Sequence, residues 1–245
     1  MFVLLPPSET KAPGGQGAPL QLTRLSFPSL GSTRSRVIAA VQAASTDADL
    51  ARAVLRLSAR QDAELAANRA LWHAATTPAL LRYTGVLYEA LGYPSLPAAD
   101  RRRADERLVV GSALFGAVRA NDAIPAYRLS AGVRLPGLGS LRSVWRPVLT
   151  AALAGGPVLD LRSSVYQALG PVPDAITVRV VSPRPDGRLA IVSHHNKAYK
   201  GRLARAMCAA DRLDGIEDVI LAAKTAELDV TRTGDNELQL RTEAG

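Results

Sequence analysis

Short apolar runs bounded by polar or glycine-rich turns predict a series of β-strands. They occupy residues 2–5, 107–110, 157–161, 176–182, 189–193, 228–232 and 237–241. Continuous apolar runs of this length are typical of buried strands. The turn residues between 183 and 187 predict a hairpin of the fourth and fifth runs, and Gly234-Asp235-Asn236 predicts a second hairpin near the C-terminus.

Apolar residues that recur every three or four positions predict helices between these strands. The predicted helices cover residues 36–44, 47–56, 58–71, 98–106, 141–153 and 216–225, and a further one begins near 197. Because strands and helices do not alternate strictly, we expect residues 1–245 to form a single mixed α/β (α+β) domain, with a mixed sheet flanked by helices. The second and third helices meet at Leu57-Ser58, where a helix–hairpin–helix-like pair and ordinary helix packing are both open.

The stretch from Ser193 to Arg205 joins a predicted strand to a predicted helix. A helix that begins in this way presents free backbone N–H groups, which attract anions. Ser193 or Asn196 is the expected N-cap residue. Lys197 and Lys200 lie three residues apart and share a face. Basic residues near a helix N-terminus are unfavourable for stability, so they indicate either an anion site or a solvated basic face.

The charge of the chain favours an anionic partner. The formal net charge is +8, and the span from Arg179 to Arg205 holds seven basic residues and one acidic residue. A polyanion such as duplex DNA, or a small phosphorylated ligand, is therefore the expected partner. Aromatic residues make up only 4% of the chain, which argues against a stacking platform for single strands.

Several classes of protein and site are not expected. The apolar start of the chain lacks a basic segment and is too short for a signal peptide, and no apolar stretch is long enough to span a membrane. With one cysteine, Cys208, we expect a cytoplasmic protein without disulfides. Adjacent His194 and His195 are poor joint metal ligands, so we expect no metal site and no cofactor.

Two other loops carry candidate ligand-binding side chains. Ser8, Thr10 and Lys11 follow the first predicted strand, a position where α/β proteins place ligand groups, although a simple turn is the alternative. Arg119, Tyr127 and Arg128 lie close together in a long loop region, where two arginines can bind phosphate bidentately. Gly111 and Gly116 have the spacing of a phosphate-binding loop. They lack the following Lys-Ser/Thr, so we interpret them as small residues for close packing.

Taken in order, five segments of the chain resemble the YaaA family of peroxide stress proteins. These segments are residues 4–11, 83–88, 111–119, 124–129 and 196–205. The resemblance implies a mixed α/β domain with a helix–hairpin–helix-like element that binds duplex DNA and limits iron-driven damage to it. The order of Thr10 and Lys11 is reversed relative to that family pattern. The family pattern implies these ligand-binding positions: Lys11, Arg119, Tyr127, Arg128, Lys197, Lys200, Gly201 and Arg205.

Two functional hypotheses follow, and a protein-interaction role for the basic face is a third. In the first, a basic cleft holds the DNA backbone without reading its sequence, so that affinity falls steeply with salt. In the second, the polar residues converge on one pocket, and the chain is an enzyme acting on a nucleotide, a phosphorylated metabolite or a DNA base. Lys197 or Tyr127 is then the candidate acid or base, with a pKa lowered by neighbouring cations.

Overall fold

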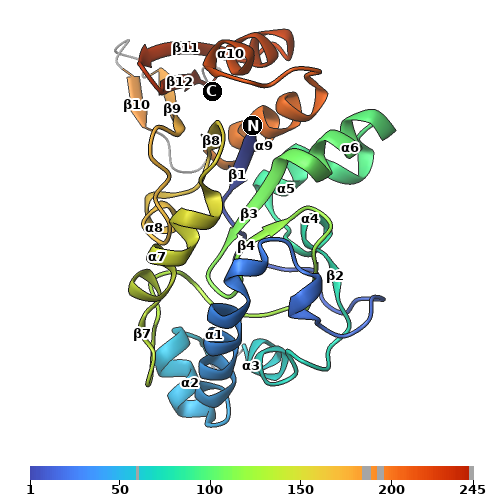
Figure 1. Ribbon diagram of the computed structural model, residues 1–245, viewed down its shortest axis with the longest axis vertical. Coiled ribbons are helices and arrows are strands. Elements are labelled where there is room, and N and C mark those ends of the chain that lie inside the picture. Colours follow the sequence, from blue (N-terminus) through green and yellow to red (C-terminus); the bar gives the residue numbers. More distant parts are fainter. Residues whose placement is uncertain (59–60, 184–188, 192–195, 243–245) are drawn as a thin grey trace.

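A mixed eight-stranded sheet forms the centre of the protein (Figure 1). The computed structural model describes residues 1–58, 61–183, 189–191 and 196–242. The strand order is β11-β12-β9-β8-β1-β3-β4, and β10 pairs with β9. The strands of this sheet are β1 (Phe2–Leu5), β3 (Leu108–Ser112), β4 (Gly116–Arg119), β8 (Val158–Asp160), β9 (Ile176–Pro183), β10 (Leu189–Ile191), β11 (Asp229–Gly234) and β12 (Glu237–Arg241).

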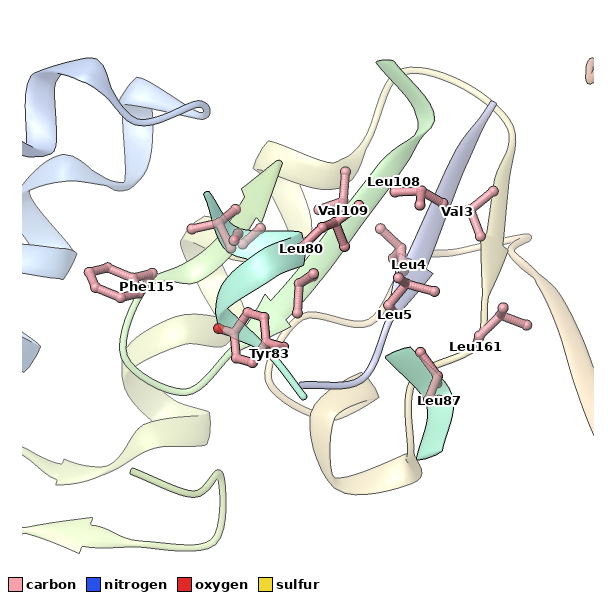
Figure 2. Packing of buried hydrophobic residues seen from close by; sticks show 14 of the residues in the cluster. Val3, Leu4, Leu5, Leu80, Tyr83, Leu87, Leu108, Val109, Phe115 and Leu161 are labelled. Carbon is pink, nitrogen blue, oxygen red and sulfur yellow. The ribbon is translucent and has the colours of Figure 1, made fainter. Parts of the chain in front are cut away.

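The first strand lies in the middle of the sheet because it is apolar along its whole length. β1 pairs in parallel with β3 on one side and with β8 on the other. Val3, Leu4 and Leu5 are at most 1% exposed, and Figure 2 shows them beside Leu108 and Val109 of β3. Strands buried on both faces are typical of parallel sheets, in which helices cover each face. The parallel core runs from β3 to β12, and antiparallel strands lie at its edges.

The described residues form ten α-helices, together with short 3-10 turns and two small ladders. The helices are α1 (Gly31–Ala44), α2 (Ala48–Leu55), α3 (Asp62–Arg69), α4 (Ala79–Arg82), α5 (Val86–Leu91), α6 (Ala98–Arg107), α7 (Leu141–Leu153), α8 (Ser164–Gln167), α9 (Asn196–Ala209) and α10 (Ile216–Thr225). The ladders pair β2 (Thr77–Pro78) with β5 (Ala123–Ile124) and β6 (Arg134–Leu135) with β7 (Gly139–Ser140). Along the long axis, α1 to α3 lie at one end of the molecule, and α10 with β11 and β12 lies at the other (Figure 1).

Close contacts at two glycines fix α7 and α9 against their neighbours. In α7, apolar residues four positions apart form the buried face, and the indole Nε1 of Trp145 donates to the carbonyl of Ala113 at 2.8 Å. Gly116 (φ +73°) adjoins that ring, and a Cβ there would lie 2.7 Å from it. The α5–α9 contact is tighter, since a Cβ on Gly201 would lie 2.2 Å from the carbonyl oxygen of Leu87. Glycine at these two positions therefore permits close packing, as the sequence predicted for Gly116.

The predicted fold class is confirmed, with differences in detail. The helices at 141–153 and 216–225 and the first strand lie where the sequence placed them. The hairpins β9–β10 and β11–β12 are also confirmed. The segment after β3 is a hairpin turn into β4, a strand that the apolar pattern did not reveal. Helices α2 and α3 occupy the two predicted helical segments, but residues 59–60 between them lie outside the described part, so the helix–hairpin–helix element stays a prediction.

Across the described ranges, no helix combines the length and the apolar character that crossing a membrane requires.

Candidate anion-binding cleft

A cleft of about 520 Å³ opens at the carboxyl edge of the central strands. β1 and β8 run parallel, so the loops that follow them meet at one edge of the sheet, where α/β proteins bind ligands. α5 and α9 complete the walls. Figure 2 shows Leu87 of α5 and Leu161 after β8 close to the end of β1. The lining is Pro6, Pro7, Ser8, Glu9, Thr10, Thr84, Gly85, Val86, Leu87, Tyr88, Leu161, Ser163, Tyr166, Asn196, Lys197 and Lys200.

The α9 wall of the cleft carries its positive charge. α9 begins at Asn196, so its first free N–H groups lie at the cleft. Lys197 is exposed, whereas Lys200 is partly buried and donates to the carbonyl of Leu161 at 2.9 Å. Burial lowers the pKa of Lys200, and the nearby charge of Asp160 opposes that effect. The Oδ1 atom of Asn196 is buried and has no hydrogen-bond partner among the described residues. Ser193, the other expected N-cap residue, lies outside the described residues with His194 and His195.

The opposite wall presents three hydroxyl groups. Ser8 Oγ and Thr10 Oγ1 lie 3.1 Å apart, and Thr84 Oγ1 donates to Thr10 Oγ1 at 3.1 Å. Gly85 is the N-cap residue of α5, with φ +97°, and a Cβ there would lie 3.4 Å from Ser8 Oγ, at ordinary van der Waals distance. The positive φ explains why glycine occupies the position. The wall therefore offers hydroxyl groups that can donate to the oxygens of an anion.

Lys11 supports this wall from behind, since it does not line the cleft itself. Its Nζ donates to the carbonyl of Ser8 at 3.1 Å and to that of Glu9 at 3.4 Å. The same atom lies 4.2 Å from the ring centroid of Tyr127, a cation–π distance. Burial lowers the pKa of the Lys11 ammonium to about 7; the charge of Arg128 adds to this effect and that of Glu9 opposes it. Lys11 is therefore the lysine poised to change charge near neutral pH.

Tyr127 belongs to a buried chain of hydroxyl groups. Its Oη lies 2.8 Å from Tyr83 Oη and 2.8 Å from Ser112 Oγ, and Ser112 Oγ accepts from the N–H of Phe115 at 3.0 Å. Tyr127 is 4% exposed, and burial raises the pKa of its phenol well above the usual value. The expectation that neighbouring cations lower this pKa is wrong, because loss of water outweighs their charge. Tyr127 supports Lys11 and does not reach the cleft.

Arg128 ties the loop after β1 to the loop region that contains Tyr127. Its Nη2 lies 3.2 Å from Glu9 Oε2, and its Nη1 donates to the Glu9 carbonyl at 3.4 Å. The backbone of Arg128 is held by the amide of Asn68, through bonds of 2.8 and 2.9 Å. The structure thus gathers Ser8, Thr10, Lys197 and Lys200 at the cleft, with Lys11, Tyr127 and Arg128 behind it.

Three predicted ligand-binding residues lie elsewhere. The guanidinium of Arg119 stacks over Phe2 and Phe27, with centroids 5.0 and 5.9 Å away, at the start of β1 and so at the opposite edge of the sheet. Gly201 packs against α5. Arg205 donates through Nη1 to the carbonyls of Leu91 and Gly92 at the C-terminus of α5. Each of these three residues makes its structural contacts outside the cleft.

Sequence reasoning missed the loop after β8. Ser163 and Tyr166 line the cleft, and the Arg162 guanidinium binds the Asp160 carboxylate through Nε at 2.9 Å and Nη2 at 2.7 Å. The available signal was the same as for Ser8, namely polar residues directly after a buried strand. Thr84, from the segment between α4 and α5, had no such signal and reaches the cleft only through the fold.

The chain is similar to several bacterial proteins over most of its length. A family model described as "Peroxide stress protein YaaA" matches residues 1–228. A UPF0246 protein of Corynebacterium efficiens is 50% identical over 218 residues, which are 86% of each chain. A UPF0246 protein of Corynebacterium glutamicum is 46% identical over 235 residues, 93% of this chain and 94% of that one. A UPF0246 protein of Streptomyces coelicolor is 46% identical over 218 residues, 85% and 83% of the two chains. With this coverage, the chain belongs to the peroxide stress protein YaaA family.

Proposed function

We propose that the cleft binds a small phosphate-bearing molecule, a nucleotide or a phosphorylated metabolite, as part of the peroxide stress response. The observation that carries the proposal is a partly buried Lys200 beside the start of α9, across the cleft from the hydroxyls of Ser8, Thr10 and Thr84. A cleft of about 520 Å³ has the size of a small-molecule site. Pro7, Val86 and Leu87 supply apolar surface for the body of the ligand.

Lys11 affects the bound molecule only indirectly. Burial lowers its pKa to about 7, but its Nζ lies behind Ser8 and Glu9 and does not line the cleft. A general acid or base must reach the proton that it transfers, so Lys11 positions this loop. Peroxide sensing by a thiol does not fit the chain. Its only cysteine, Cys208, is fully buried in α9, and burial raises the pKa of the thiol to about 12.

Thermal shift and calorimetry with nucleotides and phosphorylated metabolites test the proposal. We expect the best ligand to raise the melting temperature of the wild type and to bind Lys200→Met at least about tenfold more weakly, since a charge-assisted contact is lost. Lys224→Met is the matched control, because it removes an exposed lysine of α10. Equal affinity for wild type and Lys200→Met would contradict the proposal.

We infer a second candidate function, binding of the duplex DNA backbone, from the charge at the rim of the cleft. Lys197 is exposed there, and the chain carries a net charge of +8. Cations of this kind bind phosphates without reading sequence. Binding of this kind would shield the DNA from iron-driven damage, a role that would suit a peroxide stress protein.

A salt titration of duplex binding tests this second function. We expect affinity to fall steeply with salt, and Lys197→Ala/Lys200→Ala to weaken binding and flatten the slope by about two counterions. Arg146→Ala/Lys224→Ala controls for the loss of two positive charges, since both residues are exposed and lie outside the cleft. If affinity did not change between low and moderate salt, backbone binding would be excluded. Binding of a small phosphate-bearing molecule would then be the one proposed function that remains.

A further inference from the structure

A second cavity, of about 690 Å³, lies across α9 from the cleft. At about 100° per residue, the α9 residues that line the cleft and those that line this groove fall on nearly opposite sides of the helix. The groove is closed by the end of β9, by the start of β11 and by the end of β12. Its lining is Pro183, Tyr199, Arg202, Arg205, Ala206, Ala209, Ala226, Glu227, Leu228, Asp229, Arg241 and Thr242.

Two arginines of the groove have unused hydrogen-bond donors. Arg202 is exposed, and its guanidinium lies 5.1 Å from the ring centroid of Tyr199; no acidic partner contacts it within the described ranges. Arg205 makes its bonds to α5 and to Ser95 through Nη1 alone, so its Nε and Nη2 have no partner in the described part of the chain. A guanidinium with free N–H groups is the preferred donor to a phosphate, because two parallel bonds fit its planar fork.

A buried hydroxyl also lacks a partner here. Thr242 is 3% exposed, and its N–H donates to the carbonyl of Val181 at 2.8 Å. Its Oγ1 is buried and makes no hydrogen bond to any described residue. Buried polar atoms are nearly always paired, and Thr242 lines the groove, so its unpaired hydroxyl indicates a missing partner that a ligand would supply once the side chain rotates toward the groove.

The remaining charges restrict the class of ligand. Arg241 is only loosely paired, with its Nε 3.7 Å from Asp229 Oδ2. Glu227 and Asp229 add two carboxylates to the lining, and carboxylates accept hydrogen bonds from hydroxyl groups. A ligand with a phosphate at one end and several hydroxyls at the other complements both sets. The groove is also much larger than a phosphate ion requires.

We propose that this groove binds a sugar phosphate, at a site separate from the cleft. Arg202 and Arg205 bind the phosphate, Thr242 donates its hydroxyl to a phosphate oxygen, and the carboxylates of Glu227 and Asp229 accept from the sugar hydroxyls. The site does not depend on the cleft, and the two are tested separately.

Calorimetry with ribose 5-phosphate tests the groove, with ribose and inorganic phosphate as separate arms. The titrations use the Lys200→Met protein, in which the cleft lacks a central cation. We expect ribose 5-phosphate to bind, inorganic phosphate to bind at least about tenfold more weakly, and ribose alone not to bind. Inorganic phosphate binding as tightly as the sugar phosphate would overturn the sugar part of the proposal.

Two groove variants and one control locate the site. Arg202→Gln and Thr242→Val should each weaken ribose 5-phosphate binding about tenfold or more, and Thr242→Val removes only the unpaired hydroxyl. Arg146→Gln, an exposed arginine on α7, should leave binding unchanged. No binding of ribose 5-phosphate, or equal binding by both groove variants and the control, would overturn the proposal.

Discussion

Two groups of buried cations in this protein differ in how fully they are bonded. Arg82 is 0% exposed and donates to four backbone carbonyls, those of Ala12, Gly14, Ala75 and Ile124. Arg162 is 2% exposed and forms a bidentate pair with Asp160. By contrast, Lys11 donates to two carbonyls and Lys200 to one. Burial lowers the pKa of both lysines and also that of Arg82, so the number of hydrogen bonds distinguishes the two groups.

The difference separates cations that stabilise the fold from cations whose burial destabilises it. Removing a fully bonded guanidinium leaves buried acceptors without donors, and therefore it should lower stability strongly. A lysine with a lowered pKa is less stable in its charged form than it would be in water. Such a residue persists for a reason other than stability. Lys200 lines the candidate cleft, and Lys11 lies directly behind its wall. Substitutions that measure stability and binding separately can test this division.

The largest expected effect belongs to Arg82→Met. The substitution leaves four carbonyl groups without their donor and frees the glycine- and proline-rich loop between β1 and α1, so the free energy of unfolding should fall by about 3–5 kcal/mol. Chemical denaturation measures it, with Arg146→Met as the exposed control. A loss below about 1 kcal/mol would show that the loop does not depend on Arg82. The number of hydrogen bonds would then not distinguish the stabilising cations from the others.

Gly201→Ala should have the next largest effect. The new methyl would lie 2.2 Å from a backbone oxygen of α5, and neither helix can yield easily, so we expect a loss of about 3 kcal/mol in the free energy of unfolding. Gly215→Ala is the control, because a Cβ at Gly215 meets nothing within 4 Å. If Gly201→Ala retained full stability but lost ligand binding, Gly201 would belong with the cleft residues, as the family pattern implied.

Lys11→Met tests the cost of the buried ammonium through its pH dependence. The folded-state pKa of about 7 lies below the 10.5 of a free lysine, so unfolding takes up a proton between these values. Stability of the wild type relative to Lys11→Met should therefore rise by about 2–3 kcal/mol from about pH 6.5 to about pH 9. Lys224→Met should show no such trend. A constant difference across this range would mean that Lys11 keeps an ordinary pKa.

The sequence predicted the mixed sheet and its buried first strand, and local patterns also place several polar residues at the cleft. Residues 2–5 form a buried strand, and polar residues directly after such a strand, here Ser8 and Thr10, lie at the carboxyl edge of the sheet. The positions of Lys197 and Lys200 follow from the start of α9. These predictions needed no knowledge of distant contacts.

Other parts of the site depend on pairing that a local pattern does not contain. Arg119 was grouped with Arg128 because both lie in one stretch, yet β4 runs antiparallel to β3 and carries Arg119 to the opposite edge of the sheet. The sequence placed Arg205 with the cleft residues, but its Nη1 donates to the C-terminus of α5, and its side chain lines the groove on the other side of α9. Burial decided the pKa of Tyr127, and a count of neighbouring charges could not reveal it.

The smallest predicted effect extends the comparison to an acidic residue. Glu227 follows α10 with φ +57°, the left-handed conformation that favours glycine at a helix end. Glu227→Gly should therefore raise the free energy of unfolding by about 0.5–1 kcal/mol. It should also weaken ribose 5-phosphate binding, if the Glu227 carboxylate accepts from the sugar. Arg56 has the same φ at the end of α2, so Arg56→Gly should give a similar gain in stability without any change in binding. If both variants bound ribose 5-phosphate equally well, the Glu227 carboxylate would have no role in binding. If only Glu227→Gly bound more weakly, the glutamate would be retained for binding at the expense of stability.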